Sequence, residues 1–319
     1  MKSAMPGASR DALLRLLDGQ NTDALLIVQA GNPVLEYGDL QHRFLCHSMR
    51  KSFLSALIGI QVARGAMDLS ATLAELGISD IDPLSDVESG ATLYDLLTAR
   101  SGIYHPANYE TPWMTRIKPP RHSQPPGGVW SYNNWDFNAL GTAYSQMTGL
   151  NIHQAFLEQI ALPLGMNDFR REDGWMEPGP NSQHPAYPFR LSTRDLARFG
   201  QLFLQNGQWE NRQIIPDSWV RQSLMPYSHA GERGAYGYMW WLAREGVAFP
   251  GCVLPQGSYF AYGAGGHYCL MIPSLSAVIV HRVDTDITNR QVSRFQFGPL
   301  MTAILTFLTS LHGDIYECD

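Results

Sequence analysis

Strand-like segments lie at both ends of this chain, and the segments between them are mostly helical. Near the start, residues 23–31 and 33–39 read as two short strands around a Gly-Asn-Pro turn. Late in the chain, residues 236–242, 258–265, 268–274 and 276–284 again have strand character. Short turns join these late strands, so we expect them to pair antiparallel. We also expect the two chain ends to share one sheet.

Helical spacing of apolar residues marks the rest of the chain. It occurs at 10–17, from about Ser48 to Arg64, and at 92–99, 133–149, 151–165, 192–207 and 297–313. Ser192 stands in a good N-cap position for the 192–207 helix. These patterns predict an α+β fold in a single domain, 1–319. Its α/β lobe comes from about 1–65 and 191–319, and a helical lobe of about 66–190 is inserted between them.

Composition excludes several classes of protein. The net charge is −6 and no run of Lys and Arg forms a phosphate-binding stripe, which argues against nucleic acid. No stretch approaches eighteen apolar residues and no leader pattern opens the chain, so we expect a soluble cytoplasmic protein that does not bind a membrane. The four cysteines, Cys46, Cys252, Cys269 and Cys318, show no metal-ligand spacing and are expected to be reduced thiols.

The segment 102–130 carries six prolines and little periodicity. A structureless loop of this length in a compact domain is usually a functional lid or is disordered. The aromatic residues Tyr104, Tyr109 and Trp113 favour the lid.

Lysine is scarce in this chain: 23 residues are basic, and only Lys2, Lys51 and Lys118 are lysine. Lys51 follows Ser48 by three residues at the head of an apolar helix, so the two side chains lie on one face. The helix N-terminus and apolar surroundings both lower the pKa of an amine. A neutral amine can accept the proton of a serine hydroxyl, which arginine cannot do in a protein. This pattern predicts a nucleophile and its base.

A non-catalytic role for this pair stays open as the alternative. Ser-x-x-Lys has two fixed positions and occurs by chance about once in a soluble chain of this size. The lysine would then extend from a helix end into solvent. The scarcity of lysine and the apolar character of the helix favour the catalytic interpretation.

Two further motifs follow in the chain. Tyr132 and Asn134 form Tyr-x-Asn just before a helical run, where a phenol can relay a proton and an amide can hold an amine and a substrate carbonyl. Later, glycines at 263, 265 and 266 remove side chains from a strand edge, so that a ligand can approach the backbone. The alternatives are a core-edge tyrosine and a bulged strand or turn.

The three motifs, in this order, resemble those of the penicillin-recognising serine hydrolases. Within them the chain is most similar to the class C β-lactamase-like group, which includes esterases, D-aminopeptidases and 6-aminohexanoate-dimer hydrolases. Six segments carry the resemblance, in order: 48–59, 96–103, 132–141, 162–166, 191–209 and 236–241. It implies a β-lactamase/transpeptidase-like fold with an antiparallel sheet flanked by helices.

The resemblance also implies roles. Ser48 is the acyl-accepting nucleophile, Lys51 its general base, and Tyr132 the proton relay. Asn134 steadies Lys51 and the substrate amide. Counting back from Pro273, the third motif is Ala261-Tyr262-Gly263, so the Ala264 N–H joins that of Ser48 in an oxyanion hole; a register one or two residues away stays open.

The third motif departs from the family pattern. Ala261 stands where the family has a basic residue that binds the substrate carboxylate, and losing such a contact costs about 1.5–3 kcal/mol. This favours the esterase and oligomer-amide hydrolase branch over β-lactamases and D-Ala-D-Ala peptidases. In that branch an aromatic residue of the lid assists, and Tyr109 is the candidate. His267 is a candidate substrate contact, although a lone histidine beside a glycine strand is more often structural.

The sequence therefore predicts a hydrolase that cleaves a small ester or amide through a Ser48 acyl-enzyme. A close variant is an acyltransferase, because only exclusion of water decides which nucleophile receives the acyl group. A β-lactamase or D-Ala-D-Ala-type peptidase is the alternative activity, and a sensor module that binds an acyl group without turnover is the alternative from another class. No cofactor or metal is implied, since there is no P-loop, no Gly-x-Gly-x-x-Gly, no Gly-x-Ser-x-Gly and no His-Glu-x-x-His.

Overall fold

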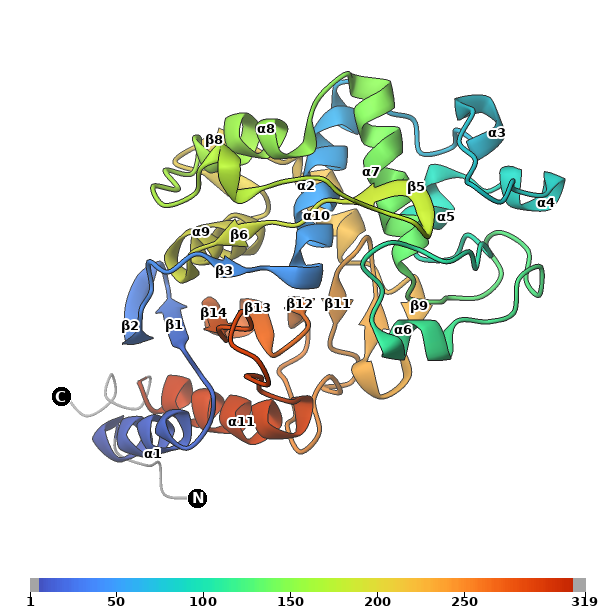
Figure 1. Ribbon diagram of the computed structural model, residues 1–319. Coiled ribbons are helices and arrows are strands. Elements are labelled where there is room, and N and C mark those ends of the chain that lie inside the picture. Colours follow the sequence, from blue (N-terminus) through green and yellow to red (C-terminus); the bar gives the residue numbers. More distant parts are fainter. Residues whose placement is uncertain (1–5, 312–319) are drawn as a thin grey trace.

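One sheet of eight strands forms the centre of the protein, in a computed structural model that describes residues 6–311 (Figure 1). The strand order is β2-β1-β14-β13-β12-β11-β10-β9, and all neighbours are antiparallel. β1, from the start of the chain, pairs with β14, from its end, which confirms that both ends share one sheet. The strands are β1 (Ala24–Gln29), β2 (Asn32–Gly38), β9 (Ser228–His229), β10 (Ala235–Tyr236), β11 (Trp241–Leu242), β12 (Tyr259–Gly263), β13 (His267–Ile272) and β14 (Ala277–Arg282).

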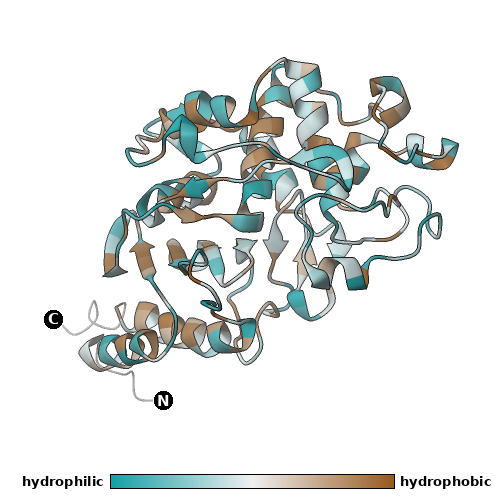
Figure 2. Ribbon diagram, in the orientation of Figure 1, coloured by the Kyte–Doolittle hydropathy of each residue, from teal (hydrophilic) through white to brown (hydrophobic). Residues whose placement is uncertain are grey.

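Helices cover both faces of the sheet. In Figure 1, α1 (Pro6–Asp18) and α11 (Arg294–Ser310) lie side by side below it, and α9 (Thr193–Leu204) contacts β1, β13 and β14 from the other face. Every residue of these three strands is buried, which explains their continuous apolar runs. Figure 2 shows the same apolar character, in brown, in β1, α2 (Arg50–Ala63) and α11.

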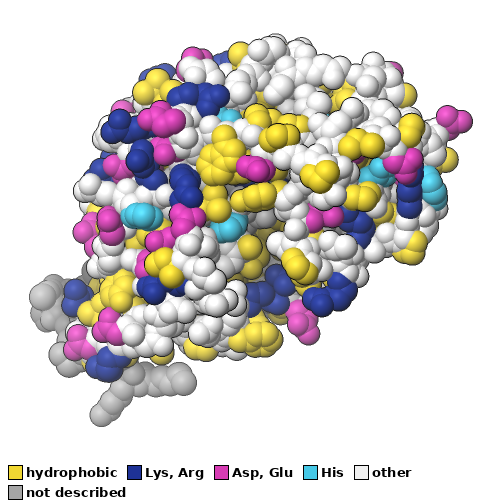
Figure 3. Space-filling view, in the orientation of Figure 1, with side chains coloured by type: hydrophobic (Ala, Val, Ile, Leu, Met, Phe, Trp, Pro, Cys, Tyr) yellow, Lys and Arg dark blue, Asp and Glu magenta, His cyan; other side chains and the backbone are white. Residues whose placement is uncertain are grey.

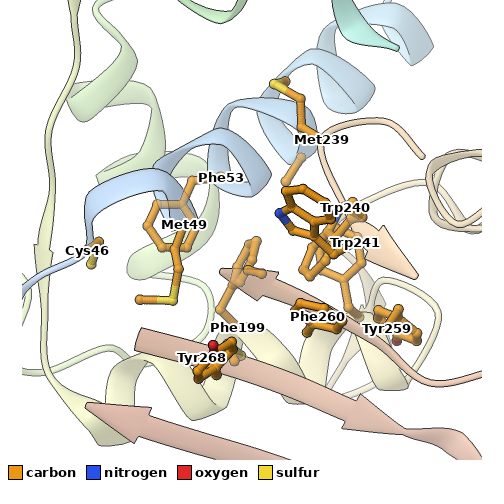
Figure 4. Packing of buried hydrophobic residues seen from close by; sticks show 14 of the residues in the cluster. Cys46, Met49, Phe53, Phe199, Met239, Trp240, Trp241, Tyr259, Phe260 and Tyr268 are labelled. Atoms are coloured by element: carbon orange, nitrogen blue, oxygen red, sulfur yellow. The ribbon is translucent and has the colours of Figure 1, made fainter. Parts of the chain in front are cut away.

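The start of α2 enters the core above the sheet. Figure 4 shows Met49 and Phe53 among the buried residues on the side of the sheet that also holds Phe199 of α9. The Phe53 and Phe199 rings lie 5.0 Å apart at nearly a right angle. Aromatic packing of this kind holds α2 rigidly over the sheet.

The inserted lobe is built from short capped helices. Thr72, Ser85 and Thr92 each open one with a capping box, in which the side chain and a carboxylate three residues on satisfy each other's backbone N–H groups. These helices are α3 (Leu73–Leu76), α4 (Asp86–Ser89) and α5 (Leu93–Leu97), and they are followed by α6 (Pro112–Ile117), α7 (Asn134–Thr148) and α8 (Ile152–Phe156).

The remaining elements are short. They are the strand pairs β3 (Phe44–Leu45) with β6 (Arg190–Leu191), β4 (Glu177–Gly179) with β5 (Ser182–Ala186) and β7 (Gln208–Trp209) with β8 (Arg212–Gln213); the helix α10 (Asp217–Ser223); the π-helix η2 (Leu157–Ala161); and the 3-10 turns η1 (His47–Met49), η3 (Arg171–Asp173), η4 (Gly231–Arg233) and η5 (Pro273–Leu275).

Two expectations about local structure were wrong. Residues 236–242 are not one strand, because β10 and β11 pair with each other through a turn. At Gly237 that turn approaches the Ser223 carbonyl oxygen so closely that a Cβ would lie 2.1 Å from it, and Met239 has φ +60°. The lid segment 102–130 is not structureless either, because Thr111 caps α6 and Pro112 occupies its first position.

The structure also bears on the cysteines and on the search for a membrane-spanning helix. Cys46, Cys252 and Cys269 are buried and free of disulfides. Cys318 and Lys2 lie outside the described residues. Within residues 6–311, every helix is too short or too polar to cross a membrane.

Candidate active site

Ser48 lies in η1, the tight turn from which α2 begins. The preceding segment is fixed by the β3–β6 pair and by the Cys46 N–H, which donates to the Phe189 carbonyl oxygen at 2.8 Å. His47 has φ +47°, a left-handed backbone conformation that is strained for residues other than glycine. The chain thus turns sharply just before Ser48, whose side chain is partly exposed.

The Lys51 amine lies 2.7 Å from the Ser48 hydroxyl oxygen, as the three-residue spacing predicts. Lys51 is only 1% exposed, and its Nζ faces the rings of Tyr132 and Phe137, with centroids at 4.8 and 5.0 Å. Within residues 6–311 no carboxylate forms an ion pair with it. Burial first, and the neighbouring Arg50 second, hold the pKa of the Lys51 amine well below its usual value.

Arg50 is a second buried cation beside Lys51, and sequence reasoning gave it no role. It is completely buried, donates one hydrogen bond to Asn138 Oδ1 at 3.1 Å, and packs over the Tyr187 ring at 4.2 Å. Its Nε and Nη1 have no hydrogen-bond partner. Because a guanidinium stays charged in proteins, Arg50 places a fixed positive charge beside the amine.

Tyr132 closes the site from the inserted lobe. It is 5% exposed and surrounded by rings, with Trp241 and Phe137 centroids at 5.2 Å and Tyr236 at 5.8 Å. Burial raises the pKa of its hydroxyl, and the Ser48 hydroxyl and Arg50 oppose that shift only in part. The phenol is therefore protonated at neutral pH and can donate its proton.

The third motif ends strand β12 directly against the Ser48 turn. A Cβ on Gly263 would lie 2.6 Å from the Cys46 carbonyl oxygen and 3.3 Å from the His47 Cβ, so only glycine fits there. Ala264 follows in the turn between β12 and β13. Outside the regular elements of residues 6–311, no backbone hydrogen bond uses the N–H of Ser48 or Ala264 as its donor. Both groups can therefore bind an oxyanion.

Asn134 reaches the site but does not hold Lys51 as expected. Its Nδ2 donates to the Tyr109 carbonyl oxygen at 2.5 Å, and its Oδ1 is buried without a hydrogen-bond partner. Tyr109 has φ +66° and is 38% exposed, and its ring faces Arg50 at 5.8 Å. In the described structure, Tyr109 thus offers its backbone oxygen to Asn134, and its ring forms part of the segment 102–130. Asn134 keeps one acceptor atom, Oδ1, for a ligand.

His267 lies behind the third motif, not in the cleft where a substrate contact was expected. It is completely buried, and its Nδ1 accepts from Arg282 Nε at 3.0 Å. Arg282 also donates to the carbonyl oxygens of Phe44 and Leu191, at 3.0 Å each, so it joins the Ser48 segment to the sheet. His47 Nε2 pairs with Thr285 Oγ1 at 2.7 Å, and burial lowers the pKa of His47 to about 4. These histidines are neutral parts of the scaffold.

The site is made of a hydroxyl, an amine, a phenol and two free N–H groups, which suit acyl transfer through a serine ester. Among residues 6–311, no three His, Cys, Asp or Glu side chains gather where they could hold a metal. Arg50 and Arg282 were missed because nothing in their local sequence distinguishes them from the chain's other arginines.

The chain resembles known proteins in its sequence pattern and in its fold. A family model described as Beta-lactamase matches residues 13–294. No curated protein matches the chain significantly in sequence.

Among solved structures, one similar protein is from Bacillus anthracis and carries the provisional name 6-aminohexanoate-dimer hydrolase. It is 22% identical over 94% of this chain and 82% of its own, with a TM-score of 0.69. A beta-lactamase from Mycobacterium bovis is 16% identical, with coverages of 93% and 99% and a TM-score of 0.68. EstCE1, a hydrolase with promiscuous acyltransferase activity, is 15% identical, with coverages of 95% and 98% and a TM-score of 0.67. At these identities the likeness shows a shared fold.

Proposed function

This chain belongs to the beta-lactamase family, and from that membership we propose that it is a serine hydrolase that cleaves an ester or amide through a Ser48 acyl-enzyme. The observation that carries the proposal is the buried Lys51 amine, 2.7 Å from the Ser48 hydroxyl and without a carboxylate partner in the described structure. Burial and the neighbouring Arg50 lower the pKa of this amine, which suits it to act as the general base.

In acylation, the Ser48 oxygen bonds to the substrate carbonyl carbon while its proton passes to Lys51 Nζ. The negative charge that develops on the carbonyl oxygen lies between the N–H groups of Ser48 and Ala264. Tyr132 then gives its proton to the leaving oxygen or nitrogen as the bond to the carbonyl carbon breaks, and takes the proton held by the Lys51 ammonium. Lys51 ends neutral, and Ser48 carries the acyl group.

Deacylation repeats these steps with water as the nucleophile. Tyr132 accepts a proton from the attacking water as its own proton passes to Lys51 Nζ. The bond to the Ser48 oxygen then breaks as that oxygen takes the proton held by Lys51. The helix α6 of segment 102–130 and the aromatic rings around Tyr132 limit the entry of bulk water. An alcohol or amine bound there can replace water, so transfer of the acyl group is a variant of the same reaction.

Ala261 supports an ester or amide substrate over a β-lactam or a D-Ala-D-Ala peptide. It is 1% exposed and carries no charge, so the third motif itself offers nothing to a carboxylate beside the scissile bond. A β-lactamase or D-Ala-D-Ala-type peptidase therefore remains the second candidate. A sensor that binds an acyl group without turnover ranks below both, because no contact in the site disables Ser48, Lys51 or Tyr132.

A fluorophosphonate probe tests the proposal. We expect covalent labelling at Ser48, mapped by mass spectrometry of the peptide, and loss of labelling in Ser48→Ala and Lys51→Met. Labelling at another serine, or undiminished labelling in Lys51→Met, would contradict it. A parallel screen of short acyl esters, D-amino-acid amides and nitrocefin then separates the candidate activities, and an acyl adduct that forms but never clears identifies the sensor.

A further inference from the structure

Two arginines lie close together on the sheet side of the cleft without an acidic partner. Arg233 ends η4 and Arg294 begins α11. Both are mostly buried, and neither takes part in any ion pair of residues 6–311, although the chain has a net charge of −6. Seven other arginines of the described residues have a carboxylate partner: Arg43, Arg121, Arg190, Arg194, Arg221, Arg244 and Arg290.

The two guanidinium groups are held near each other. Arg294 Nη2 donates to the carbonyl oxygens of Glu232 and Ala248, at 3.0 Å each, so its position is tied to the turn that carries Arg233. Burial lowers the pKa of Arg294, and the charge of Arg233 lowers it further. Two like charges in a partly desolvated place repel each other unless an anion lies between them.

Both arginines also lie near the Tyr262 hydroxyl. Burial raises the pKa of that hydroxyl, and the charges of Arg233 and Arg294 act in the opposite direction. Tyr262 is the middle residue of the third motif, directly before Gly263. Two other elements therefore place positive charge near the Tyr262 side chain, although Ala261 itself carries none.

The lid connects the arginine pair to the catalytic residues. Arg233 Cζ lies 4.6 Å from the Trp113 ring centroid, and the Trp113 ring lies 6.4 Å from that of Tyr132. Figure 3 shows Lys or Arg side chains (dark blue) on this face, in the region between α6 and α11. Arg233 is thus one aromatic ring away from the proton relay, and Arg294 lies beside Arg233 at the same crevice.

The crevice beneath the pair does not hold a ligand itself. Arg233, Arg294, Tyr262, Trp241, Phe260 and Tyr268 are among its lining residues, and its volume is about 10 Å³, room for one water molecule at most. A bound group would lie over the mouth of this crevice, between the guanidinium groups and against aromatic rings. Planar guanidinium donors match the two oxygens of a carboxylate.

We propose that Arg233 and Arg294 form a subsite for a carboxylate carried by the non-reacting end of the substrate. This inference rests on the proposed function and deepens it: the substrate is an acidic ester or amide, with its free carboxylate away from the scissile bond. The competing explanation is that Arg233 only supports the lid through its contact with the Trp113 ring.

Two matched pairs of esters test the subsite. The first pair is the p-nitrophenyl monoester of pentanedioic acid and p-nitrophenyl hexanoate, which differ in the free carboxylate on the acyl side. The second pair, the butanoyl esters of 3-hydroxybenzoic acid and of 3-methylphenol, places the carboxylate on the leaving group. In at least one of the two pairs, we expect kcat/KM to be at least about tenfold higher for the acidic ester than for the neutral one, mainly because KM is lower. This preference should weaken in high salt.

Variants assign the preference to the two arginines. Arg233→Met and Arg294→Met are each expected to lower the ratio of acidic to neutral kcat/KM by about tenfold. Arg244→Met is the matched control, because Arg244 is half exposed and paired with Glu245, and it should leave the ratio unchanged. Thermal unfolding of each variant checks that it folds.

Equal kcat/KM within both ester pairs of the wild type, or a preference that survives in the doubly substituted R233M/R294M protein, overturns the subsite. The wild-type ratio and its salt dependence decide the matter even if a variant fails to fold. Failure of the proposed function looks different, because no ester of either pair would then be turned over and Ser48 would stay unlabelled.

Discussion

Two regions of the molecule each bury a lysine, and they treat the amine in opposite ways. In the first turn of α2, Lys51 is 1% exposed and contacts a hydroxyl, two aromatic rings and a neighbouring arginine. In the lid segment, the Lys118 side chain is 9% exposed, forms an ion pair with Glu110 and donates to the His105 carbonyl oxygen at 2.5 Å. Both amines are largely withdrawn from water, Lys51 more completely, and the counter-charge differs.

A buried amine is suited to accept a proton where no acidic group holds it in the charged form. A carboxylate and a carbonyl satisfy the charge of Lys118, so that residue ties the base of the lid together. Within residues 6–311 no carboxylate balances a charge on Lys51, and the adjacent guanidinium opposes one. The absence of an acid beside Lys51, within residues 6–311, is therefore the feature that suits it to accept a proton.

Replacing each lysine in turn gives the largest expected difference between the two regions. Lys51→Met should lower kcat/KM for ester hydrolysis by about 10³-fold or more, because Ser48 loses its base. Lys118→Met should cost less than about tenfold, since it loosens the lid without touching the reacting atoms. Stopped-flow or steady-state ester hydrolysis measures both, and comparable losses would show that the two lysines do not differ in role.

The charge beside Lys51 can be removed separately. Arg50→Met takes away the cation that lowers the pKa of Lys51, so that pKa rises and the acidic limb of the pH profile of kcat/KM moves to higher pH. At a pH on that limb, activity should fall about tenfold, with little change on the plateau. Arg50→Lys keeps a positive charge and should keep the limb in place. A uniform loss at all pH values would show that Arg50 acts only through packing.

Removing the acid from the lid should give a smaller effect. Glu110→Gln leaves Lys118 as a buried cation held by a carbonyl alone, which destabilises the lid by about 1–3 kcal/mol and should raise KM several-fold. The doubly substituted E110Q/K118M protein removes both charges and should recover part of the loss. Michaelis–Menten constants with thermal unfolding test this, and a double variant worse than either single one would contradict the ion-pair interpretation.

The smallest expected effect is on the free energy of unfolding, and its sign differs between the two lysines. Burial and Arg50 hold the pKa of folded Lys51 well below its ordinary value of 10.5, which the unfolded amine keeps. The unfolded state therefore binds the extra proton, and this residue penalises folding increasingly as the pH falls below 10.5. Lys51→Met should stabilise the protein by about 1–2 kcal/mol at pH 7, and less at pH 10. Lys118→Met should destabilise it at both; urea unfolding at the two pH values is the measurement.

Local chemistry explains which parts of the site could be foreseen. The 2.7 Å contact between Ser48 and Lys51 follows from helix geometry over three residues. The helix α7 could be read from its Asn133 cap and its left-handed Gly149. In each case neighbours in the chain decide the structure.

The misjudged features depend on segments far apart in the chain. Residues 236–242 form a hairpin because Gly237 packs against the Ser223 carbonyl, and His267 is buried because Arg282 binds it from β14. Asn134 bonds to the Tyr109 backbone because the lid returns to that point. None of these contacts can be recognised from the sequence of the segment that makes it.

From the sequence we could predict the main elements, the sheet shared by both chain ends, and the place of Lys51 beside Ser48, because periodicity, capping and three-residue spacing act over one or two helical turns. The charges around that amine, the burial of Arg50 and the meeting of Arg233 with Arg294 depend on how distant segments pack. The physical reason is that a pKa and an anion subsite depend on the sum of nearby charges and on access of water, and both are set by residues that folding brings together from distant parts of the chain.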